Sequence, residues 1–202
     1  MLIVFRSYTP LAFHGISGYR GYSGLAPDIT IPRDPITGLP LFYGVKGVMR
    51  EYARGVYEEC KYYAPAFLFG VYLDGKWHRV YSDEIQDGLH LKDEWLCRWQ
   101  VEESLIWKKV LGEHFEEEIS YKPVGLSMVI DVIPRNKIEK NGVATTTWLE
   151  EEISPEAILV SSAWCKDVNS CPKLCKEFTV ERKKFIGGSI TLGRGMVDVY
   201  IF

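Results

Sequence analysis

The spacing of apolar and polar residues predicts a chain built mostly of short strands, with a few helices. Apolar residues at positions 45, 48, 49, 52, 53 and 56 fall on one face of a helix, so residues 44–63 predict a helix. Residues 101–111 predict another, and so do residues 172–185, which have a proline in their first turn. Runs rich in β-branched and aromatic residues predict three strands, at residues 2–9, 157–164 and 196–202.

Two further patterns predict pairs of antiparallel strands joined by tight turns. Residues 67–82 surround an Asp-Gly pair at positions 74–75, which is a strong signal for a two-residue hairpin turn. Strands at residues 126–133 and 143–153 are joined across an Asn-Gly pair at positions 141–142.

The order of these elements indicates the fold class. With residues 64–142 set aside, the chain runs strand, helix, strand, strand, helix, strand, and residues 143–153 provide the second strand. This is the βαββαβ order of ferredoxin-like, or RRM-like, proteins. We therefore predict an α+β protein whose core comprises residues 1–63 and 143–202. Residues 64–142 are then a large insertion between the first helix and the second core strand.

Composition supports a folded chain with no membrane-spanning segment. The chain has 202 residues, of which 47% are hydrophobic, and this suits one domain with a large insertion. No apolar run approaches the roughly 20 residues that a membrane span requires. The apolar start, residues 1–5, has neither the basic region nor the cleavage site of a signal peptide. Together with an odd count of five cysteines, this predicts reduced thiols and a cytoplasmic location.

Charge is spread unevenly along the chain, although the net charge is only −3. Residues 1–54 carry six Lys/Arg against three Asp/Glu, and residues 166–202 carry seven against four. The middle, residues 55–165, is strongly acidic, with eleven against twenty. The two basic ends would form one basic face, suited to nucleic acid, if they meet in space.

Two basic segments are candidates for phosphate binding. The loop "GGSITLGRG" (187–195) has four glycines that let backbone N–H groups approach an anion, and Arg194 adds a bidentate donor. Lys46, Arg50 and Arg54 follow one another at four-residue steps along the first predicted helix. The alternatives are a flexible turn for the loop and a solvated surface for the helix.

Several other residues have both a chemical and a structural interpretation. His14, in a glycine-rich loop, suits a phosphate or 2′-hydroxyl contact or a general base, and the alternative is a hydrogen bond to the backbone. Cys165, Cys171 and Cys175 lack the tight pairs of most zinc sites and have no fourth ligand nearby, so we favour buried thiols over zinc. The acidic runs 116–118 and 150–152 are most simply solvated surface.

Four sequence stretches together resemble the RAMP superfamily of CRISPR-associated proteins. Within it, they are most similar to the repeated backbone subunit of type III effector complexes of the Cmr and Csm type. Asp28, twelve residues before Pro40, matches the position of the family's catalytic aspartate. The stretches are "HGISG" (14–18), "RDPITGLP" (33–40), "YGVKGVMR" (43–50) and "FIGGSITLGRGMVDV" (185–199). The third is about two residues shorter than the family's motif and lacks its two serines and its second proline.

The resemblance implies a role in antiviral defence within a ribonucleoprotein. Such subunits stack as a filament along a guide RNA, beside other effector subunits, and a thumb-like hairpin in the insertion displaces a nucleotide pair at regular intervals. Asp28 would cleave the paired single-stranded target RNA with a divalent Mg²⁺ or Mn²⁺ ion, by attack of the neighbouring 2′-hydroxyl and formation of a cyclic phosphate. The implied RNA-binding residues are His14, Arg20, Lys46, Arg50, Gly187, Gly188, Gly193 and Arg194.

Three alternatives remain open on the sequence. The chain could be a backbone paralogue that holds guide RNA without cutting. It could be a stand-alone ribonuclease that processes guide RNA with His14 as its base. It could also be a ferredoxin-like protein unrelated to RNA that binds metal through its cysteines. Asp34, in contrast to Asp28, is interpreted as a turn residue, because Asp-Pro is a turn signal.

Overall fold

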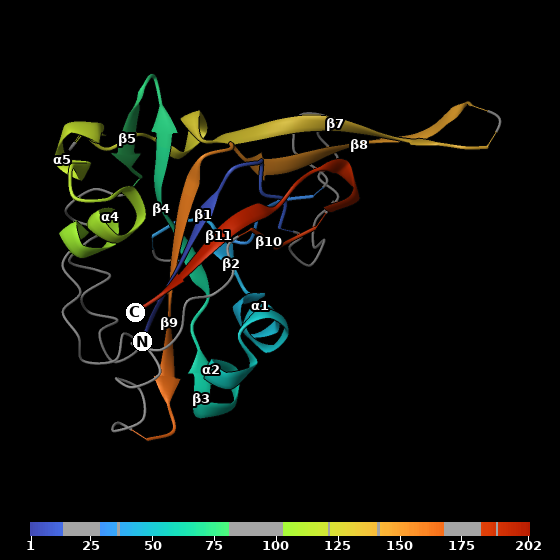
Figure 1. The fold of residues 1–202 in the computed structure, drawn as a ribbon. Helices are drawn as coiled ribbons and strands as arrows, with labels where there is room; N and C mark the ends of the chain where they lie inside the picture. Colours follow the sequence, from blue (N-terminus) through green and yellow to red (C-terminus); the bar gives the residue numbers. More distant parts are fainter. Residues whose placement is uncertain are drawn as a thin grey trace.

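The computed structural model describes residues 1–13, 29–35, 37–80, 103–120, 122–140, 142–167, 183–188 and 190–202, and every structural statement below concerns these residues. They form a mixed α+β fold with one large sheet and a long two-stranded hairpin (Figure 1). The N- and C-terminal residues lie side by side, since Leu2 and Phe202 exchange backbone hydrogen bonds of 2.6 and 3.0 Å. No helix among the described residues is long and apolar enough to cross a membrane.

The main sheet is built around four antiparallel strands in the order β11-β1-β9-β4. Their bounds are β1 (Leu2–Ser7), β4 (Ala66–Leu73), β9 (Ala157–Cys165) and β11 (Met196–Ile201). Short strands extend the sheet on both sides and pair at its ends: β2 (Leu41–Phe42), β3 (Cys60–Tyr63), β5 (Lys76–Arg79), β6 (Ile119–Ser120) and β10 (Lys184–Phe185). The strands predicted at residues 2–9, 157–164 and 196–202 are therefore confirmed.

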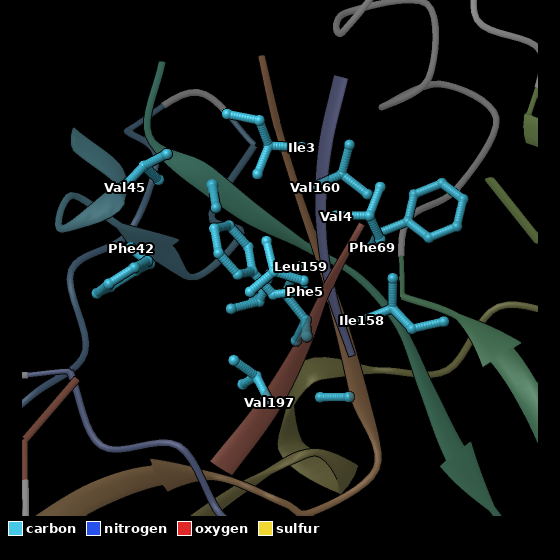
Figure 2. Close-up of a cluster of buried hydrophobic side chains, with 14 of the residues drawn as sticks. Ile3, Val4, Phe5, Phe42, Val45, Phe69, Ile158, Leu159, Val160 and Val197 are labelled. Atoms are coloured by element: carbon cyan, nitrogen blue, oxygen red, sulfur yellow. The ribbon is translucent and has the colours of Figure 1, made fainter. Parts of the chain in front are cut away.

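The central strands are buried on both faces, and this explains their nearly continuous apolar sequences. In β1, Phe5 lies opposite Leu159 of β9 and Val199 of β11. Figure 2 shows Phe5 and Leu159 within a cluster of buried side chains that includes Phe42 and Val45. Because such burial removes roughly 1.5–3 kcal/mol of unfavourable hydration per large side chain, this cluster is the main source of the sheet's stability.

Four helices are described, and two of them replace the single helix predicted at residues 44–63. They are α1 (Val45–Tyr52), α2 (Arg54–Glu59), α4 (Glu103–Leu111) and α5 (Phe115–Glu118). Ala53 has non-helical backbone angles and separates α1 from α2, and residues 60–63 form β3 instead of helix. The helix predicted at 101–111 is confirmed from residue 103 onward.

The hairpin predicted at residues 67–82 is confirmed as β4 and β5. Its turn lies at Asp74 and Gly75, which both have positive φ angles, as a tight hairpin turn requires. Helix α4 packs on this region, where the Trp107 and Phe69 rings lie 4.8 Å apart. A Cβ atom at Gly70 would lie 2.4 Å from the Trp107 ring, so only glycine fits there.

A second hairpin projects from the sheet as a long two-stranded ribbon (Figure 1). It consists of β7 (Ile130–Ile138) and β8 (Ala144–Ile153), which follow the short 3₁₀ turn η1 (Leu126–Met128). The placement of residues 143–153 as the second strand of the main sheet is therefore wrong. Strand β4 pairs with β9 instead, because its almost wholly apolar sequence suits a position buried on both faces, whereas β8 carries three glutamates.

Part of the helix predicted at residues 172–185 lies outside the described residues. At its end, Lys184 and Phe185 pair with β11 as strand β10, so the helical prediction is wrong for these two residues.

Candidate nucleic-acid interface

Three segments that the sequence singled out as RNA-binding meet at a pair of stacked rings. Phe13, which precedes His14, stacks on Phe42, which lies just before α1, with ring centroids 4.5 Å apart. The glycine-rich loop joins them, since the N–H of Gly188 donates a 2.7 Å hydrogen bond to the carbonyl of Ala12. Gly187 has a φ of +82°, and a Cβ atom there would lie 2.6 Å from that carbonyl oxygen. Glycine at this position therefore permits the close approach of the loop.

Helix α1 presents its basic residues to solvent beside this junction. Lys46 and Arg50 are exposed, whereas Val45, Val48 and Met49 are buried against the sheet. The predicted spacing on α1 is thus confirmed for these residues. Arg54 is different, because it belongs to α2 and forms an exposed ion pair of 2.9 Å with Glu58. The three cations do not lie along one continuous helix.

The far end of α1 contacts the strand that leads into the glycine-rich loop. The Tyr52 hydroxyl donates a 3.4 Å hydrogen bond to the carbonyl of Phe185. The Lys184 ammonium lies 4.9 Å from the centre of the Tyr52 ring, within range of a cation–π contact. The strand that leads into the glycine-rich loop therefore brings a third cation, Lys184, to the C-terminal end of α1.

The described part of the glycine-rich loop turns its arginine inward. It contains the 3₁₀ turn η2 (Ile190–Leu192), after which Gly193 is exposed with open space around it. Gly195 packs so closely that a Cβ atom would lie 2.0 Å from the carbonyl oxygen of Ile186. Arg194, between these two glycines, is only 8% exposed.

Arg194 belongs to a buried group of charges that we call the charged cluster: Arg135, Glu150, Glu152 and Arg194. Its guanidinium pairs with Glu152. Arg135 on β7 donates to Glu150 at 3.1 Å and to Glu152 at 3.2 Å. Glu150 is 3% exposed and Glu152 5%, so the prediction that residues 150–152 are solvated surface is wrong for both. The cluster joins the base of the hairpin to the glycine-rich loop.

Burial makes the Glu152 carboxyl a weaker acid than an ordinary glutamate. It raises the pKa of the Glu152 carboxyl above its ordinary value, with the charge of Glu150 adding to the shift and Arg135 opposing it. The folded protein therefore holds the proton of this carboxyl more tightly than the unfolded chain does. Stability contributed by this protonation is present below about pH 4.3, the ordinary glutamate pKa, and is lost as pH rises through the folded-state pKa.

We expect Glu152→Gln to remove this pH dependence. The difference in free energy of unfolding, wild type minus variant, should fall as pH rises from about 4 to 7, because only the wild type loses a proton in this window. Urea denaturation of both proteins at several pH values in this range measures the difference in free energy of unfolding. The contributions of the other titratable groups, which both proteins share, cancel in this difference. A difference that stays constant or grows with pH would contradict the raised pKa.

Three of the predicted site residues, His14, Arg20 and Asp28, lie outside the described residues. The residue after Asp28 is firmly placed. Ile29 forms a parallel bridge with β8, with its N–H 3.0 Å from the carbonyl of Leu149 and its carbonyl 2.9 Å from the N–H of Glu151. The chain leaving Asp28 is thus fixed to the base of the hairpin.

Asp34 closes a turn, as the sequence predicted. Its carboxylate accepts a 3.0 Å hydrogen bond from the N–H of Thr37, and its carbonyl accepts one of 2.8 Å from Gly38. A bridge between Arg33 and Pro40 closes the loop. The Asp-Pro turn signal was sufficient for this assignment.

The cysteines give no metal site among the described residues, where no group of three His, Cys, Asp or Glu is placed to hold an ion. Cys165 is disulfide-bonded, so the prediction of reduced thiols is wrong for this residue. Cys171 and Cys175 lie outside the described residues. The preference for buried thiols over zinc at these positions stays a prediction.

Sequence reasoning missed the charges that organise this region: Arg33, Arg135, Glu150, Glu151 and Glu152. One available signal was the strand pattern itself. Successive side chains of a strand point to opposite faces, so three consecutive glutamates on a strand with one covered face cannot all be solvated. Which arginines would pair with them depends on contacts distant in sequence, and no local pattern predicts those.

Comparison with known proteins gives a fold but no sequence match. No protein-family model matches the chain, and no curated protein matches it by sequence. In three dimensions it is similar to a chain of the Type III-B Cmr-beta cryo-EM structure bound to cognate target RNA, with 16% identity, a TM-score of 0.65 and coverage of 98% of this chain and 95% of that one.

Two crystal structures show the same likeness. One is of Cmr4, with 16% identity, a TM-score of 0.58 and coverage of 100% and 98% of the two chains. The other is of oligomeric Cmr4 from Pyrococcus furiosus, with 15% identity, a TM-score of 0.60 and coverage of 100% and 97%. The chain has the fold of these proteins over nearly its whole length.

Proposed function

We propose that this protein is a backbone subunit of a type III CRISPR effector complex, which binds guide RNA and cleaves paired target RNA through Asp28. The observation that carries the proposal is the fold shared with Cmr4 over nearly both full lengths, at TM-scores of 0.58 and 0.60. Independent support comes from the junction at Phe13 and Phe42, which brings the residue before His14, the chain entering α1 and the glycine-rich loop together.

We assign a ferredoxin-like core to strands β1, β4, β9 and β11. Their spatial order, fourth-first-third-second along the chain, is that of a βαββαβ unit, and α1 and α2 connect the first strand to the second. On this assignment the insertion lies between the second and third core strands, from β5 to β8. The β7–β8 hairpin is then the thumb, and it includes residues 143–153.

Guide RNA would lie along the side of the sheet where α1 meets the glycine-rich loop. Lys46, Arg50 and Lys184 supply positive charge there, and the exposed backbone at Gly193, with open space around its Cα, leaves room for a phosphate to approach. The buried position of Arg194 fits support of the loop better than direct contact with a phosphate. Its assignment to RNA binding stays a prediction, as do those of His14 and Arg20.

The proposed cleavage reaction requires one carboxylate from this chain and a divalent ion. The 2′-hydroxyl of the target would attack the adjacent phosphorus, the bond to the 5′-oxygen would break, and this oxygen would take a proton from water, leaving a 2′,3′-cyclic phosphate and a 5′-hydroxyl. Asp28 would orient this 2′-hydroxyl and accept its proton. A divalent ion, Mg²⁺ or Mn²⁺, would neutralise charge on the phosphate, and one carboxylate with RNA phosphates and water suits its coordination.

The partners follow from the same assignment. They are guide RNA, single-stranded target RNA, further copies of this chain in a filament and other type III effector subunits. We place the complex in the cytoplasm.

We expect the paired substitution Lys46→Ala and Arg50→Ala to weaken guide-RNA binding and to reduce its salt dependence. For every phosphate that the variant no longer neutralises, the slope of log affinity against log salt should fall by about 0.7, since fewer counterions are released on binding. Fluorescence anisotropy of the assembled protein with labelled RNA between low and moderate salt measures it.

A matched control removes the same charge elsewhere. Lys76→Ala and Lys108→Ala delete two exposed cations from β5 and α4, away from α1, and should leave the salt slope unchanged. Equal slopes for all three proteins would rule out α1 as a phosphate-binding surface.

A further inference from the structure

The base of β8 holds the segment that follows Asp28 through a side chain as well as through the backbone. Backbone hydrogen bonds to Leu149 and Glu151 fix Ile29 at one point. The Glu151 carboxylate supplies a second, because its Oε2 accepts a 3.0 Å hydrogen bond from the N–H of Ile31. Together they fix three consecutive residues of the chain against the strand.

Arg33 extends this contact by an ion pair. One of its terminal nitrogens lies 2.9 Å from Oε1 and 3.0 Å from Oε2 of Glu151. The Glu151 side chain is 11% exposed and that of Arg33 35%, so water screens the pair only in part. The carboxylate therefore makes a charged contact and a backbone contact at the same time.

The strand separates Glu151 from its two neighbours. Glu150 and Glu152 point to the face that holds Arg135 and Arg194, and Glu151 points to the opposite face, toward Ile31 and Arg33. The Glu151 side chain thus contacts the segment after Asp28, at Ile31 and Arg33. It can therefore act on that segment without being part of the charged cluster.

We propose that Glu151 is a positioning residue for target cleavage, which holds the Ile29–Arg33 segment so that Asp28 meets the RNA in the correct orientation. This inference rests on the proposed function of Asp28. The bridge at Ile29 holds the chain to β8 at one point, and the Glu151 carboxylate adds a second attachment to the same strand at Ile31, which restrains rotation of the segment relative to β8. Displacements of about 1 Å in a reacting group cost roughly 10²-fold in rate, so such a restraint is valuable.

Single-turnover cleavage by the assembled complex tests this. Glu151→Ala removes the hydrogen bond to Ile31 and the ion pair with Arg33, and should lower the cleavage rate at saturating target by about 10- to 100-fold. The target concentration that gives half of the maximal rate should stay unchanged, because Glu151 itself does not bind RNA. Glu151→Gln keeps an acceptor for the Ile31 N–H but loses the ion pair, and Arg33→Ala loses the ion pair alone. Both should give intermediate rates.

Glu58→Ala serves as the matched control, and the wild-type and Asp28→Ala complexes serve as references. Glu58→Ala breaks an exposed glutamate–arginine pair on α2 and should cut at the wild-type rate. If Asp28→Ala abolishes cutting but all Glu151 and Arg33 variants cut within twofold of wild type, the inference fails and the proposed function stands. If Asp28→Ala cuts normally, the catalytic assignment fails and this inference fails with it.

Loss of folding is separated from loss of positioning. Complex assembly and thermal melting are measured for every variant, and if Glu151→Ala does not assemble, Glu151→Gln and Arg33→Ala carry the test. A rate loss that is explained wholly by weaker target binding overturns the inference, since a positioning residue lowers the rate at saturation instead.

Discussion

Complexes assembled with Asp28→Ala should bind guide and target RNA normally yet lose the regularly spaced cuts. A carboxylate that orients or deprotonates the attacking hydroxyl contributes about 10²- to 10⁴-fold to rate, so the cleavage rate should fall by at least about 100-fold. Asp28→Asn keeps the shape of the side chain but not its charge, so its cleavage rate should fall by a similar factor. Denaturing gels of end-labelled target RNA measure both the rate and the spacing of the cuts.

The same experiment distinguishes the remaining alternatives. A chelator should stop wild-type cutting, and Mg²⁺ or Mn²⁺ should restore it. If the wild-type complex binds target but never cuts, the chain is a paralogue that only holds guide RNA. If the isolated protein cuts repeat RNA and His14→Ala stops it, the chain is instead a stand-alone processing ribonuclease. Normal cutting by Asp28→Ala would sink the catalytic assignment.

Arg135→Ala should lower the free energy of unfolding by about 3–5 kcal/mol, the largest stability effect that we expect of a single substitution here. Arg135 contacts both Glu150 and Glu152, which are 3% and 5% exposed. Removing it takes an arginine partner from two buried carboxylates at once, at the base of the hairpin. Buried charges that lose a partner are costly because water cannot replace it.

Urea denaturation of the purified chain measures this loss, from the midpoint and slope of the transition. Arg54→Ala is the matched control, because it breaks an arginine–glutamate pair whose side chains are 82% and 60% exposed. Exposed pairs of this kind contribute about 0.3–0.5 kcal/mol. A loss of similar size in both variants would show that the charged cluster is not effectively buried.

The local signals in the sequence were reliable where neighbours along the chain decide the structure. The Asp74-Gly75 turn, the turn closed by Asp34 and the helix at Glu103–Leu111 depend on backbone preferences and on the spacing of apolar side chains. The match of short motifs to a known family was also sufficient to predict the fold that the comparisons then found.

Strand placement was predicted less well, because it depends on competition between segments. Residues 66–73 and 144–153 both have strand-forming sequences, and only packing decides which lies beside β9. The more apolar segment, β4, takes the buried position. The helix at residues 44–63 was overestimated for a similar reason, since pairing of Cys60–Tyr63 with β9 overrides its helical spacing.

The candidate site was predicted only in its outline. Lys46 and Arg50 are exposed on α1, as expected, and the strand that leads into the glycine-rich loop contacts the end of α1 at Tyr52. Arg194 lies in the glycine-rich loop, where the motif suggests phosphate binding, but its guanidinium pairs with Glu152. Its partner is 42 residues away in sequence, on a strand first assigned to another sheet, so motif reasoning could not have found it.

The β7–β8 hairpin behaves mechanically as a lever arm. Nine residues of β7 at about 3.3 Å each give it a length of roughly 30 Å, so a rotation of about 5° at its base moves its tip by some 2.6 Å. An apolar contact at the base would resist such a rotation weakly, because hydrophobic burial has no preferred direction. The ion pair between Glu152 and Arg194, which joins the hairpin to the glycine-rich loop, is directional. Angular stiffness, and not only stability, is thus a consequence of placing charges at this pivot.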